Sequence, residues 1–568
     1  MESCNRYLNR AMLRQSIFLA SKDCNMSNGI YTSPVPINEP IKSYAPGSPE
    51  KSDVKRELTA LTATITKIPL VIGGEHLYTS ATNPVICPHN KSKIIAQCSI
   101  AGAKEAKQAI DACGKSRKQW ANLPWEDRAA VFLKAADLLA TKYRPLMNAA
   151  TMLGQSKNIF QAEIDAAVEL IDFFRFNVHF AEQIYRTQPF SPAGQWNRLS
   201  ARGLEGFVYA IAPFNFTSIS INLAVAPALM GCAVLWKPPA TGALSSWIGM
   251  QILEEAGLPP GIINFLPGNS SEISSVALKH PDLAGIHFTG STNTFHMLWQ
   301  TVGQSLASYR AYPRMVGETG GKNFVFAHSS ADIDMLVVAL VRGAFEYQGQ
   351  KCSAASRAYI PKSIWPQVKE KLVAMTDSLK MGGPEDFTNF VNAVIDEKSF
   401  TKIKGFIDHA NSSNSCNVIA GGQCDGSKGF FIRPTIIETT DSKAKTMVEE
   451  IFGPVLTVYP YEDLAFEATM KICDESTPYA LTGAIFAKNR HTINEMTSAL
   501  ENAAGNFYVN DKPTGAVVGQ QPFGGARASG TNDKAGSMYN LLRWVNHRTI
   551  KENFLPIVDH RYPFMAES

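Results

Sequence analysis

The residue best suited to covalent chemistry is Cys352, which lies in the segment GQKCSAAS. Small neighbouring residues leave room for a substrate beside its sulfur, and the thiolate is the nucleophilic form of cysteine. We expect the adjacent Lys351 to lower the pKa of this thiol. An inert core residue is the more usual role of a cysteine, and we assign it to the other nine. Since no CxxC pair and no zinc spacing is present, the cysteines indicate a reducing or protected compartment.

Three further positions carry groups that can act with such a thiol. Glu318 lies between glycines in GETGGKN, where a carboxylate can act as a general base on water or form an ordinary turn. Asn215, in APFNF, can donate its amide to an oxyanion or satisfy turn backbone. Gly290 and Ser291 open a predicted helix, where N–H groups can hold a pyrophosphate, or they form a turn without a ligand. The 11 histidines are dispersed, and we predict no metal site.

A parallel sheet is the element that must position these groups. Four apolar strands alternate with helix-length segments, at 207–213, 233–238, 263–268 and 285–290. Such alternation predicts βαβ units, and parallel sheets bind ligands beyond the carboxyl ends of their strands. The residues at or just past those ends are Asn215, Lys237, Gly268, Gly290 and Ser291. No GxGxxG follows the first strand, so we expect a nucleotide-binding α/β sheet without the usual dinucleotide fingerprint.

A second α/β unit is predicted further along the chain. It has strands at 322–327 and 356–364 and a helix at 331–347, and Cys352 lies in the loop between. Residues 100–185 have apolar residues at three- and four-residue steps, which predicts helices. Residues 186–206 lose that period, and we expect a protruding hairpin there.

Composition excludes several classes of protein. The 568 residues are 45% hydrophobic and 18% charged, the balance of a globular chain. The formal net charge is +4, with no Lys/Arg-rich run, which disfavours a nucleic-acid partner. The uncharged stretch 206–236 contains polar residues and prolines, so we interpret it as strand, turn, helix and strand rather than as a membrane span.

The N-terminus has a different composition from the rest. Arg6, Arg10 and Arg14 recur on one helical face, with a single acidic residue before Asp23. Basic, amphipathic and acid-poor character is typical of a mitochondrial transit segment, which we place at 1–25; a frayed basic tail is the alternative. We interpret residues 26–55 as a non-periodic arm rather than an independent domain.

Seven motifs in order, individually weak, resemble the aldehyde dehydrogenase superfamily over roughly residues 65–555. They are APFNF, WKPPA, FTGS, GETGGKN, GQKCSA, EEIFGPV and FGGARASG. Within it, GQKCSAASR, VNDKPTG and GQQPFGGARASGTNDKAG look like the branch that oxidises L-glutamate γ-semialdehyde to L-glutamate in proline catabolism. The alternatives are another semialdehyde or aldehyde as substrate, or a fold homologue without catalysis.

The resemblance implies a fold and a set of domains. The fold is α/β, with two open α/β domains, a Rossmann-variant NAD-binding domain and a catalytic domain, and a small β oligomerisation arm. The NAD-binding domain would comprise 26–185, which includes the N-terminal arm, and 207–315, and the catalytic domain 316–536. Segments 186–206 and 537–568 would be the oligomerisation arms. The protein would be a mitochondrial-matrix homodimer or higher oligomer; docking to a proline-oxidising enzyme is left open.

The resemblance also implies roles for individual residues. Cys352 would attack the aldehyde, Asn215 and the Cys352 N–H would hold the oxyanion, and Glu318 would activate water. The expected NAD-binding residues are Ala212, Pro213, Phe214, Lys237, Gly290, Ser291, Glu450 and Phe452. The expected substrate-binding residues are Lys351, Ser353, Gly515, Ala516 and Phe523.

Two positions depart from the family pattern. Ala240 stands where many members have a Glu that binds the ribose 2′-OH, so discrimination against NADP is less firm. Ala516 stands where related sequences tend to have Ser, so backbone donors survive there but a hydroxyl is lost.

Overall fold

The computed structural model describes residues 29–565, and the predicted transit segment 1–25 lies outside them. The chain divides after Pro34 into two units. Residues 29–34 have irregular backbone. All that follows concerns the second unit, which begins at Val35.

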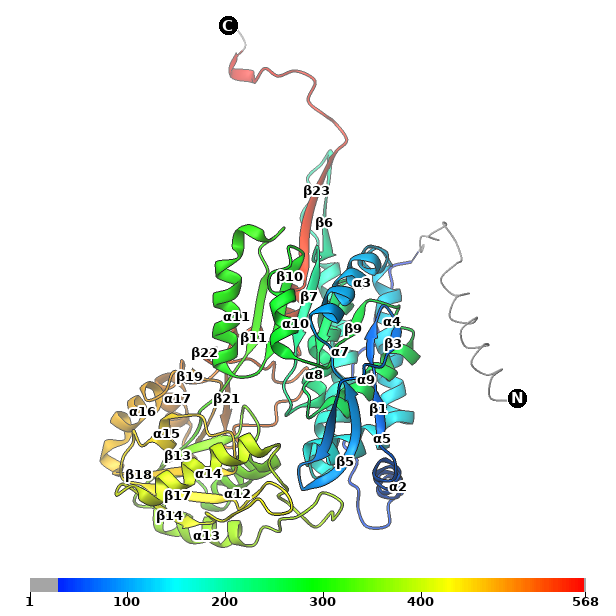
Figure 1. Cartoon of the computed structure of the whole chain (residues 1–568). Helices are drawn as coiled ribbons and strands as arrows, with labels where there is room; N and C mark the ends of the chain where they lie inside the picture. The colour runs from blue at the N-terminus through cyan, green and yellow to red at the C-terminus, as the bar shows by residue number, and fades with distance from the viewer. Residues whose placement is uncertain (1–28, 566–568) are drawn as a thin grey trace, which may run out of the picture. The chain divides into compact units, whose positions relative to one another are not determined.

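The first of two seven-stranded sheets has the order β11-β10-β7-β8-β9-β2-β3 (Figure 1). Its strands are β2 (Leu70–Ile72), β3 (Glu75–Leu77), β7 (Phe207–Ile211), β8 (Ala233–Lys237), β9 (Ile263–Phe265), β10 (Leu283–Thr289) and β11 (Arg314–Glu318). The strands from β7 to β11 are parallel, as the alternation predicts. The chain runs outward from β7 to β9 and then returns to β10 beside β7, so the topological switch point lies between β7 and β10.

Both faces of this sheet are covered by helices, which explains the continuous apolar runs of its strands. Val208 and Ala210 pack into one core with α4, α5, α7, α8 and α9, while Phe207 and Tyr209 pack into another with α3, α10 and α11. These helices are α3 (Ala103–Ala121), α4 (Trp125–Leu138), α5 (Arg144–Gln155), α7 (Leu170–Arg186), α8 (Thr217–Leu229), α9 (Ala243–Ala256), α10 (Ser270–Ala277) and α11 (Thr292–Gln304). The helical prediction for 100–185 is confirmed; α6 (Ile159–Ala162) and the π-helical turns Leu139–Tyr143 and Glu163–Glu169 complete that region.

The second sheet has the order β14-β17-β18-β13-β12-β20-β21. Its strands are β12 (Asn323–Ala327), β13 (Ala355–Pro361), β14 (Cys416–Ala420), β17 (Thr435–Thr439), β18 (Val455–Tyr461), β20 (Thr482–Phe486) and β21 (Asn506–Val509). The helices of this region are α12 (Ile333–Phe345), α13 (Trp365–Asp377), α14 (Glu397–Ser412), α15 (Lys445–Val448), α16 (Phe466–Glu475) and α17 (Arg490–Ala499). All neighbours are parallel except β14 and β17, so the chain forms two open α/β sheets, which confirms the predicted fold class.

Smaller elements flank the sheets. The three-stranded sheet β1-β5-β4 consists of β1 (Thr66–Ile68), β4 (Thr82–Cys87) and β5 (Asn90–Ser99). Two-stranded pairs are β15 (Cys424–Asp425) with β16 (Phe431–Ile432) and β19 (Tyr479–Ala480) with β22 (Ala526–Arg527). Helix α2 (Pro49–Ala63) starts within the segment interpreted as a non-periodic arm, and it has Pro at its first position.

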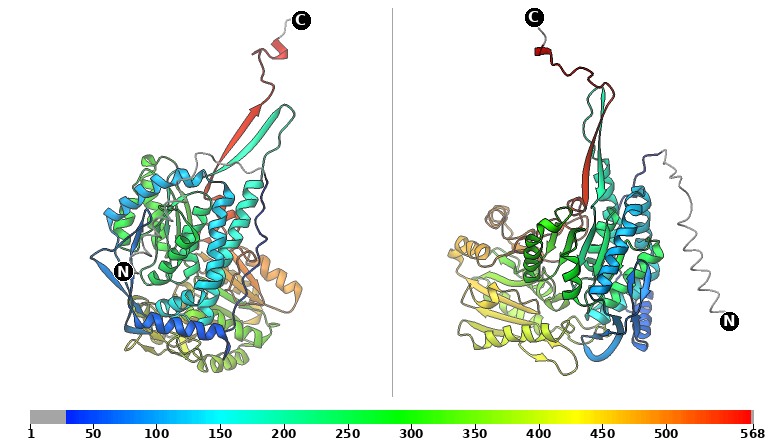
Figure 2. Two further views of the ribbon diagram at one scale, coloured as in Figure 1. Left: turned by 90° about the vertical axis from the view of Figure 1, so that its right-hand side faces the viewer. Right: turned by 45° about the horizontal axis from the view of Figure 1, so that its top comes forward.

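The expected hairpin within 186–206 is wrong. This region provides one strand, β6 (Gln195–Gly203), which pairs antiparallel with β23 (Val545–Asn553) near the C-terminus. The two strands run side by side and extend away from the first sheet (Figures 1 and 2). A local pattern cannot specify a partner more than 300 residues away.

The uncharged stretch 206–236 forms β7, a turn, α8 and β8, as the sequence predicts. Among residues 29–565, none of the helices combines the length and the apolar character that a membrane span needs.

Trp544 anchors the start of β23, because its ring is fully buried between α18 (Met538–Leu542) and the first sheet, 4.6 Å from the ring of His287. We predict that Trp544→Ala lowers the free energy of unfolding by about 3–5 kcal/mol, since it leaves a cavity in the core. Trp299 is 48% exposed, and Trp299→Ala is the matched control, expected to cost about 1 kcal/mol. Urea unfolding checks both, and equal losses would contradict the assigned role of Trp544.

Candidate functional site

Cys352 lies where the two sheets meet, in the loop between α12 and β13. The residues before it have left-handed backbone: φ is 49° at Tyr347, 54° at Gln348 and 64° at Gly349. Only glycine fits at position 349, because a Cβ added to Gly349 would lie 2.1 Å from the carbonyl oxygen of Gly453. Non-glycine residues in this region are strained and need surrounding contacts to persist, and such strain clusters at functional sites.

Buried hydrogen bonds hold this loop in place. The Gln348 amide donates to the carbonyls of Ser156 (2.9 Å) and Ala393 (2.8 Å). The Gln350 side-chain oxygen accepts from the Ile395 N–H (2.9 Å). The loop is therefore a rigid platform for the thiol.

Asn323, at the start of β12, fixes the backbone that directly follows the thiol. Its amide donates to the carbonyls of Cys352 (2.7 Å) and Ala354 (2.8 Å), and its oxygen accepts from the Thr482 N–H (3.0 Å). Asn323 was not predicted from the sequence as a site residue. The GETGGKN motif contains it, but only the fold shows that it spans to the Cys352 loop.

Asn215 connects the first sheet to the same loop. It follows β7 at the switch point, is 4% exposed, and donates one amide hydrogen to the Gln350 carbonyl (3.2 Å). Among the described residues, its second amide hydrogen and the Cys352 N–H have no acceptor. Two donors beside the thiol are the arrangement that stabilises an oxyanion.

Glu318 ends β11, beside the switch point. One oxygen of its side chain accepts from the Gly525 N–H (3.1 Å), and its backbone carbonyl accepts from the Gly290 N–H (3.1 Å). Burial raises the pKa of Glu318 well above its usual range, against the opposing effects of the Gly525 hydrogen bond and the Lys534 charge. A carboxylate with a raised pKa is a stronger base, which suits general-base chemistry.

The thiol itself is held in its neutral form. Burial raises the pKa of Cys352 to about 12, and the negative charges of Glu318, Glu450 and Glu169 add to that effect. The expectation that Lys351 lowers this pKa is wrong. Its ammonium pairs with the Glu346 carboxylate at 2.9 Å, and both side chains are 3% exposed.

Glu169 is a second residue that influences the thiol and was not predicted from the sequence. The single hydroxyl of Ser218 lies 2.8 Å from the Asp165 carboxylate and 2.6 Å from that of Glu169. The Asp165 carboxylate also accepts from the Lys157 ammonium (2.5 Å). Burial raises the pKa of Glu169 to about 8, and the nearby Asp165 carboxylate adds to that effect.

The predicted substrate-binding residues lie on two adjoining loops. The Ser353 hydroxyl is hydrogen-bonded to that of Thr514 (2.7 Å), directly before Gly515 and Ala516. The N–H groups of Gly515 and Ala516 have no acceptor among the described residues. Phe523 is half-buried and exchanges backbone hydrogen bonds with Ala535 (3.0 and 2.8 Å).

The predicted cofactor-binding residues of the first sheet lie along its carboxyl edge. The half-buried Lys237 ends β8 and has no hydrogen-bond or ion-pair partner for its ammonium among the described residues, while burial lowers its pKa. Its carbonyl accepts from the Ala212 N–H (3.1 Å), and Pro213 and Phe214 follow. Ser291 caps α11, and its hydroxyl accepts from the Thr294 N–H (3.3 Å).

Two predicted cofactor-binding residues, Phe452 and Glu450, come from the part of the chain that forms the second sheet. The Phe452 ring lies edge-on to that of Phe214, with centroids 5.8 Å apart. A Glu450 oxygen accepts from the Gly321 N–H (2.8 Å). An unpartnered ammonium, a helix N-terminus and a carboxylate are groups that bind ribose hydroxyls and a pyrophosphate, so the residues present fit a dinucleotide.

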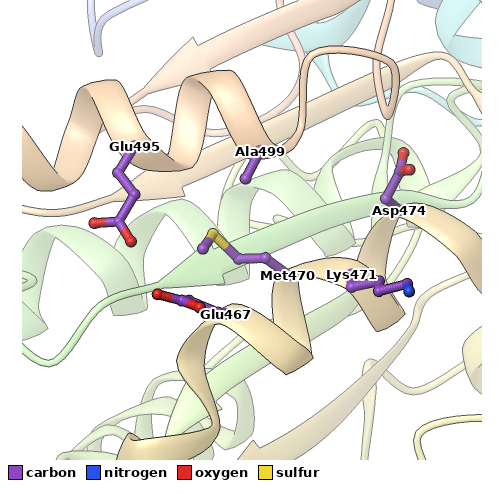
Figure 3. Close-up of a pocket in the computed structure, with 6 residues that line it drawn as sticks. All are labelled: Glu467, Met470, Lys471, Asp474, Glu495 and Ala499. Carbon is purple, nitrogen blue, oxygen red and sulfur yellow. The ribbon is translucent and has the colours of Figure 1, made fainter.

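A hollow between α16 and α17 is separate from this site. It has a volume of about 360 Å³ and is lined by Glu467, Met470, Lys471, Asp474, Glu495 and Ala499 (Figure 3). None of these residues belongs to the predicted site.

Comparison with known proteins agrees with the geometry. The model of the aldehyde dehydrogenase family matches residues 78–550. A Dictyostelium discoideum protein named delta-1-pyrroline-5-carboxylate dehydrogenase, mitochondrial, is 53% identical and aligns over 94% of this chain and 96% of its own. The human protein of the same name is 49% identical over 93% and 94% of the two chains.

Comparison with solved structures also finds similarity to enzymes of this name. The delta-pyrroline-5-carboxylate dehydrogenase of Mycobacterium tuberculosis, bound with NAD, has a TM-score of 0.92 and 51% identity, and covers 95% of this chain and 100% of its own. The corresponding enzyme of Thermus, also with bound NAD, has a TM-score of 0.86 and 30% identity, with 92% and 100% covered. The chain belongs to the aldehyde dehydrogenase family.

Since Glu318 raises the pKa of Cys352, we predict that Glu318→Gln shifts the pH midpoint for alkylation of Cys352 by iodoacetamide downward. At pH 8 the variant should react several-fold faster than the wild type. Peptide mapping measures this rate. Glu467→Gln, an exposed change on α16, should leave the midpoint unchanged. An upward shift in the Glu318 variant would contradict the electrostatic assignment.

Proposed function

We propose that this protein oxidises L-glutamate γ-semialdehyde, the open form of Δ1-pyrroline-5-carboxylate, to L-glutamate with NAD as oxidant. The observation that carries this is the placement of Cys352 beside both a base and two unpartnered donors, next to a loop with free backbone N–H groups. Relatives at about half identity that match almost end to end, and carry the name of this activity, support the same substrate.

The first step forms a bond between the Cys352 sulfur and the aldehyde carbon. The thiol is protonated at neutral pH, so its proton must leave to solvent as the carbon–sulfur bond forms. The carbonyl oxygen becomes an oxyanion, stabilised by the Asn215 amide and the Cys352 N–H. The product is a thiohemiacetal on Cys352.

The second step converts the thiohemiacetal to a thioester. NAD held at the edge between the two sheets would supply the acceptor for the hydride that leaves the former aldehyde carbon. Glu318 then takes a proton from water, whose oxygen attacks the thioester. The carbon–sulfur bond breaks, the acid leaves, and the Cys352 thiol is restored.

We assign NAD to the edge between the two sheets, and with it the domains predicted from sequence. Lys237 and Glu450 would bind the two riboses, and Gly290 and Ser291 the pyrophosphate at the α11 N-terminus. Phe452 would pack beside the nicotinamide. The first sheet with its arm would form the NAD-binding domain, and residues 316–536 the catalytic domain.

We assign the substrate to the loops that adjoin the thiol. The N–H groups of Gly515 and Ala516 would bind the α-carboxylate, and the loss of a hydroxyl at Ala516 leaves these donors in place. Ser353 would contact the substrate near the thiol, and Phe523 would pack on its aliphatic part. The role of Lys351 as a substrate ligand stays a prediction, although its ammonium already pairs with Glu346.

Location and assembly follow from the relatives and from the exposed β6–β23 pair. The Dictyostelium and human relatives carry the word mitochondrial in their names, and we place this protein in the mitochondrial matrix. The two strands, with the exposed Phe554, Leu555 and Val558 beyond them, would form the contact of a homodimer or higher oligomer. Docking to a proline-oxidising enzyme stays a prediction.

Replacing the nucleophile or the base should stop turnover at different steps. We predict that Cys352→Ala forms no NADH, since no thiohemiacetal forms. Glu318→Gln should release a burst of no more than one NADH per subunit, after which steady-state turnover falls about 100-fold or more. Stopped-flow absorbance of NADH measures both. Full turnover by the Cys352 variant would refute the mechanism.

A panel of aldehydes tests the substrate. We expect kcat/KM to be higher for glutamate γ-semialdehyde than for succinic semialdehyde or a fatty aldehyde. A higher value for either competitor would assign the chain to another branch of the family.

Position 240 should control the choice between NAD and NADP. Ala240 is exposed just after the β8 end, so a carboxylate placed there would repel a 2′-phosphate. We predict that Ala240→Glu lowers kcat/KM with NADP about tenfold and changes that with NAD less than threefold. Steady-state kinetics with both cofactors measures this, and an equal loss with both would contradict the assignment.

A further inference from the structure

Residues 38–45, here called the N-terminal strap, lie before the part of the chain that the family model matches. The strap leads into α2, as the dark-blue trace in the left view of Figure 2 shows. Its Tyr44 hydroxyl donates to the buried Glu163 carboxylate (2.7 Å), which also accepts from the Lys42 N–H (2.9 Å). Glu39 pairs with Arg144 and with Arg175 (2.8 Å). These contacts fix the strap to the helices beneath it.

Asn38, at the start of the strap, reaches a different part of the molecule. Its amide nitrogen donates to the Asp172 carboxylate (2.8 Å) and to the Val518 carbonyl (2.9 Å). Its oxygen accepts from the Gln520 amide (2.9 Å). Both the nitrogen and the oxygen of the Asn38 amide are therefore hydrogen-bonded, and two of the three hydrogen bonds go to one loop.

That loop, residues 514–520, begins beside the nucleophile. At its start, the Thr514 hydroxyl is bonded to Ser353, the residue after Cys352. The unpartnered N–H groups of Gly515 and Ala516 lie between this anchor and the Asn38 anchor at Val518. The loop therefore presents its free donors from a segment that is tied at both ends.

The contacts of the Asn38 end leave the loop little freedom. Val518 is 5% exposed, and the loop backbone lies directly on α7, since a Cβ added at Gly519 would lie 2.2 Å from the Phe176 ring. Asp172, the carboxylate that holds Asn38, also belongs to α7 and accepts from the Glu39 N–H (2.8 Å). Asn38 thus ties together the strap, α7 and the loop.

We propose that Asn38 is a positioning residue that sets the specificity for carboxylate-bearing aldehydes, by holding loop 514–520 so that its free N–H groups converge on the substrate carboxylate. The inference rests on the proposed function, because it takes the anion bound there to be the substrate carboxylate. A displacement of convergent N–H donors by about 1 Å steeply lowers their affinity for a carboxylate. The same displacement of the loop leaves the groups that act on the aldehyde in place.

The test compares an aldehyde that has the carboxylate with one that lacks it. In Asn38→Ala we expect the KM for glutamate γ-semialdehyde to rise about tenfold, while kcat and the KM values for propanal and for NAD change less than twofold. Tyr44→Phe is the matched control, since it removes a hydrogen bond of the same strap that does not touch the loop. It should lower the thermal unfolding midpoint without changing the ratio of the two aldehyde KM values.

A second variant keeps the proposal testable if Asn38→Ala folds poorly. Gln520 is exposed, so Gln520→Ala removes one of the Asn38 contacts without disturbing the strap, and should raise the same KM about two- to threefold. A parallel loss with both aldehydes, or an unchanged KM in both variants, would overturn the positioning role. If the wild type does not oxidise glutamate γ-semialdehyde at all, the proposed function fails instead.

Discussion

The site depends on hydrogen bonds that reach the Cys352 loop from both sheets. Asn215 extends from the carboxyl edge of the first sheet to Gln350, and Asn323 extends from the amino edge of the second to Cys352 itself. Neither sheet contains the site alone, because Glu318 ends a strand of one and Cys352 precedes a strand of the other. The strained backbone at Tyr347 and Gln348 persists because these bonds, with those of the Gln348 and Gln350 side chains, hold it.

The electrostatics of the site follow from this placement. Three carboxylates influence a buried thiol, and Lys351 does not offset them because Glu346 holds its ammonium. The thiol is therefore unreactive until its proton is removed, while the raised pKa of Glu318 suits that carboxylate to act as a base on water. Burial also raises the pKa of Glu169, to about 8, so its negative charge near the thiol is smaller at neutral pH than at higher pH.

Much of the fold was predictable because burial on both faces gives continuous apolar strands, as in β7, β8 and β10. The rule that ligands bind beyond the carboxyl ends of strands selected Asn215, Lys237 and Ser291 as candidates. It could not select Cys352, because that residue precedes β13; the motif around Cys352 identified it instead. Helix α2 was predictable and was missed, since Ser48, Pro49 and Glu50 are a helix-start pattern. Asn323, Glu169 and the β6–β23 pairing depend on contacts between distant segments, for which one sequence gives no signal.

Mass analysis of the covalent intermediate tests the central claim most directly. Glu318→Gln protein mixed with glutamate γ-semialdehyde and NAD, quenched in acid and digested, should carry a glutamyl thioester on the peptide that contains Cys352, and on no other cysteine. A thioester on another cysteine, or NADH formation without any adduct at Cys352, would contradict the account.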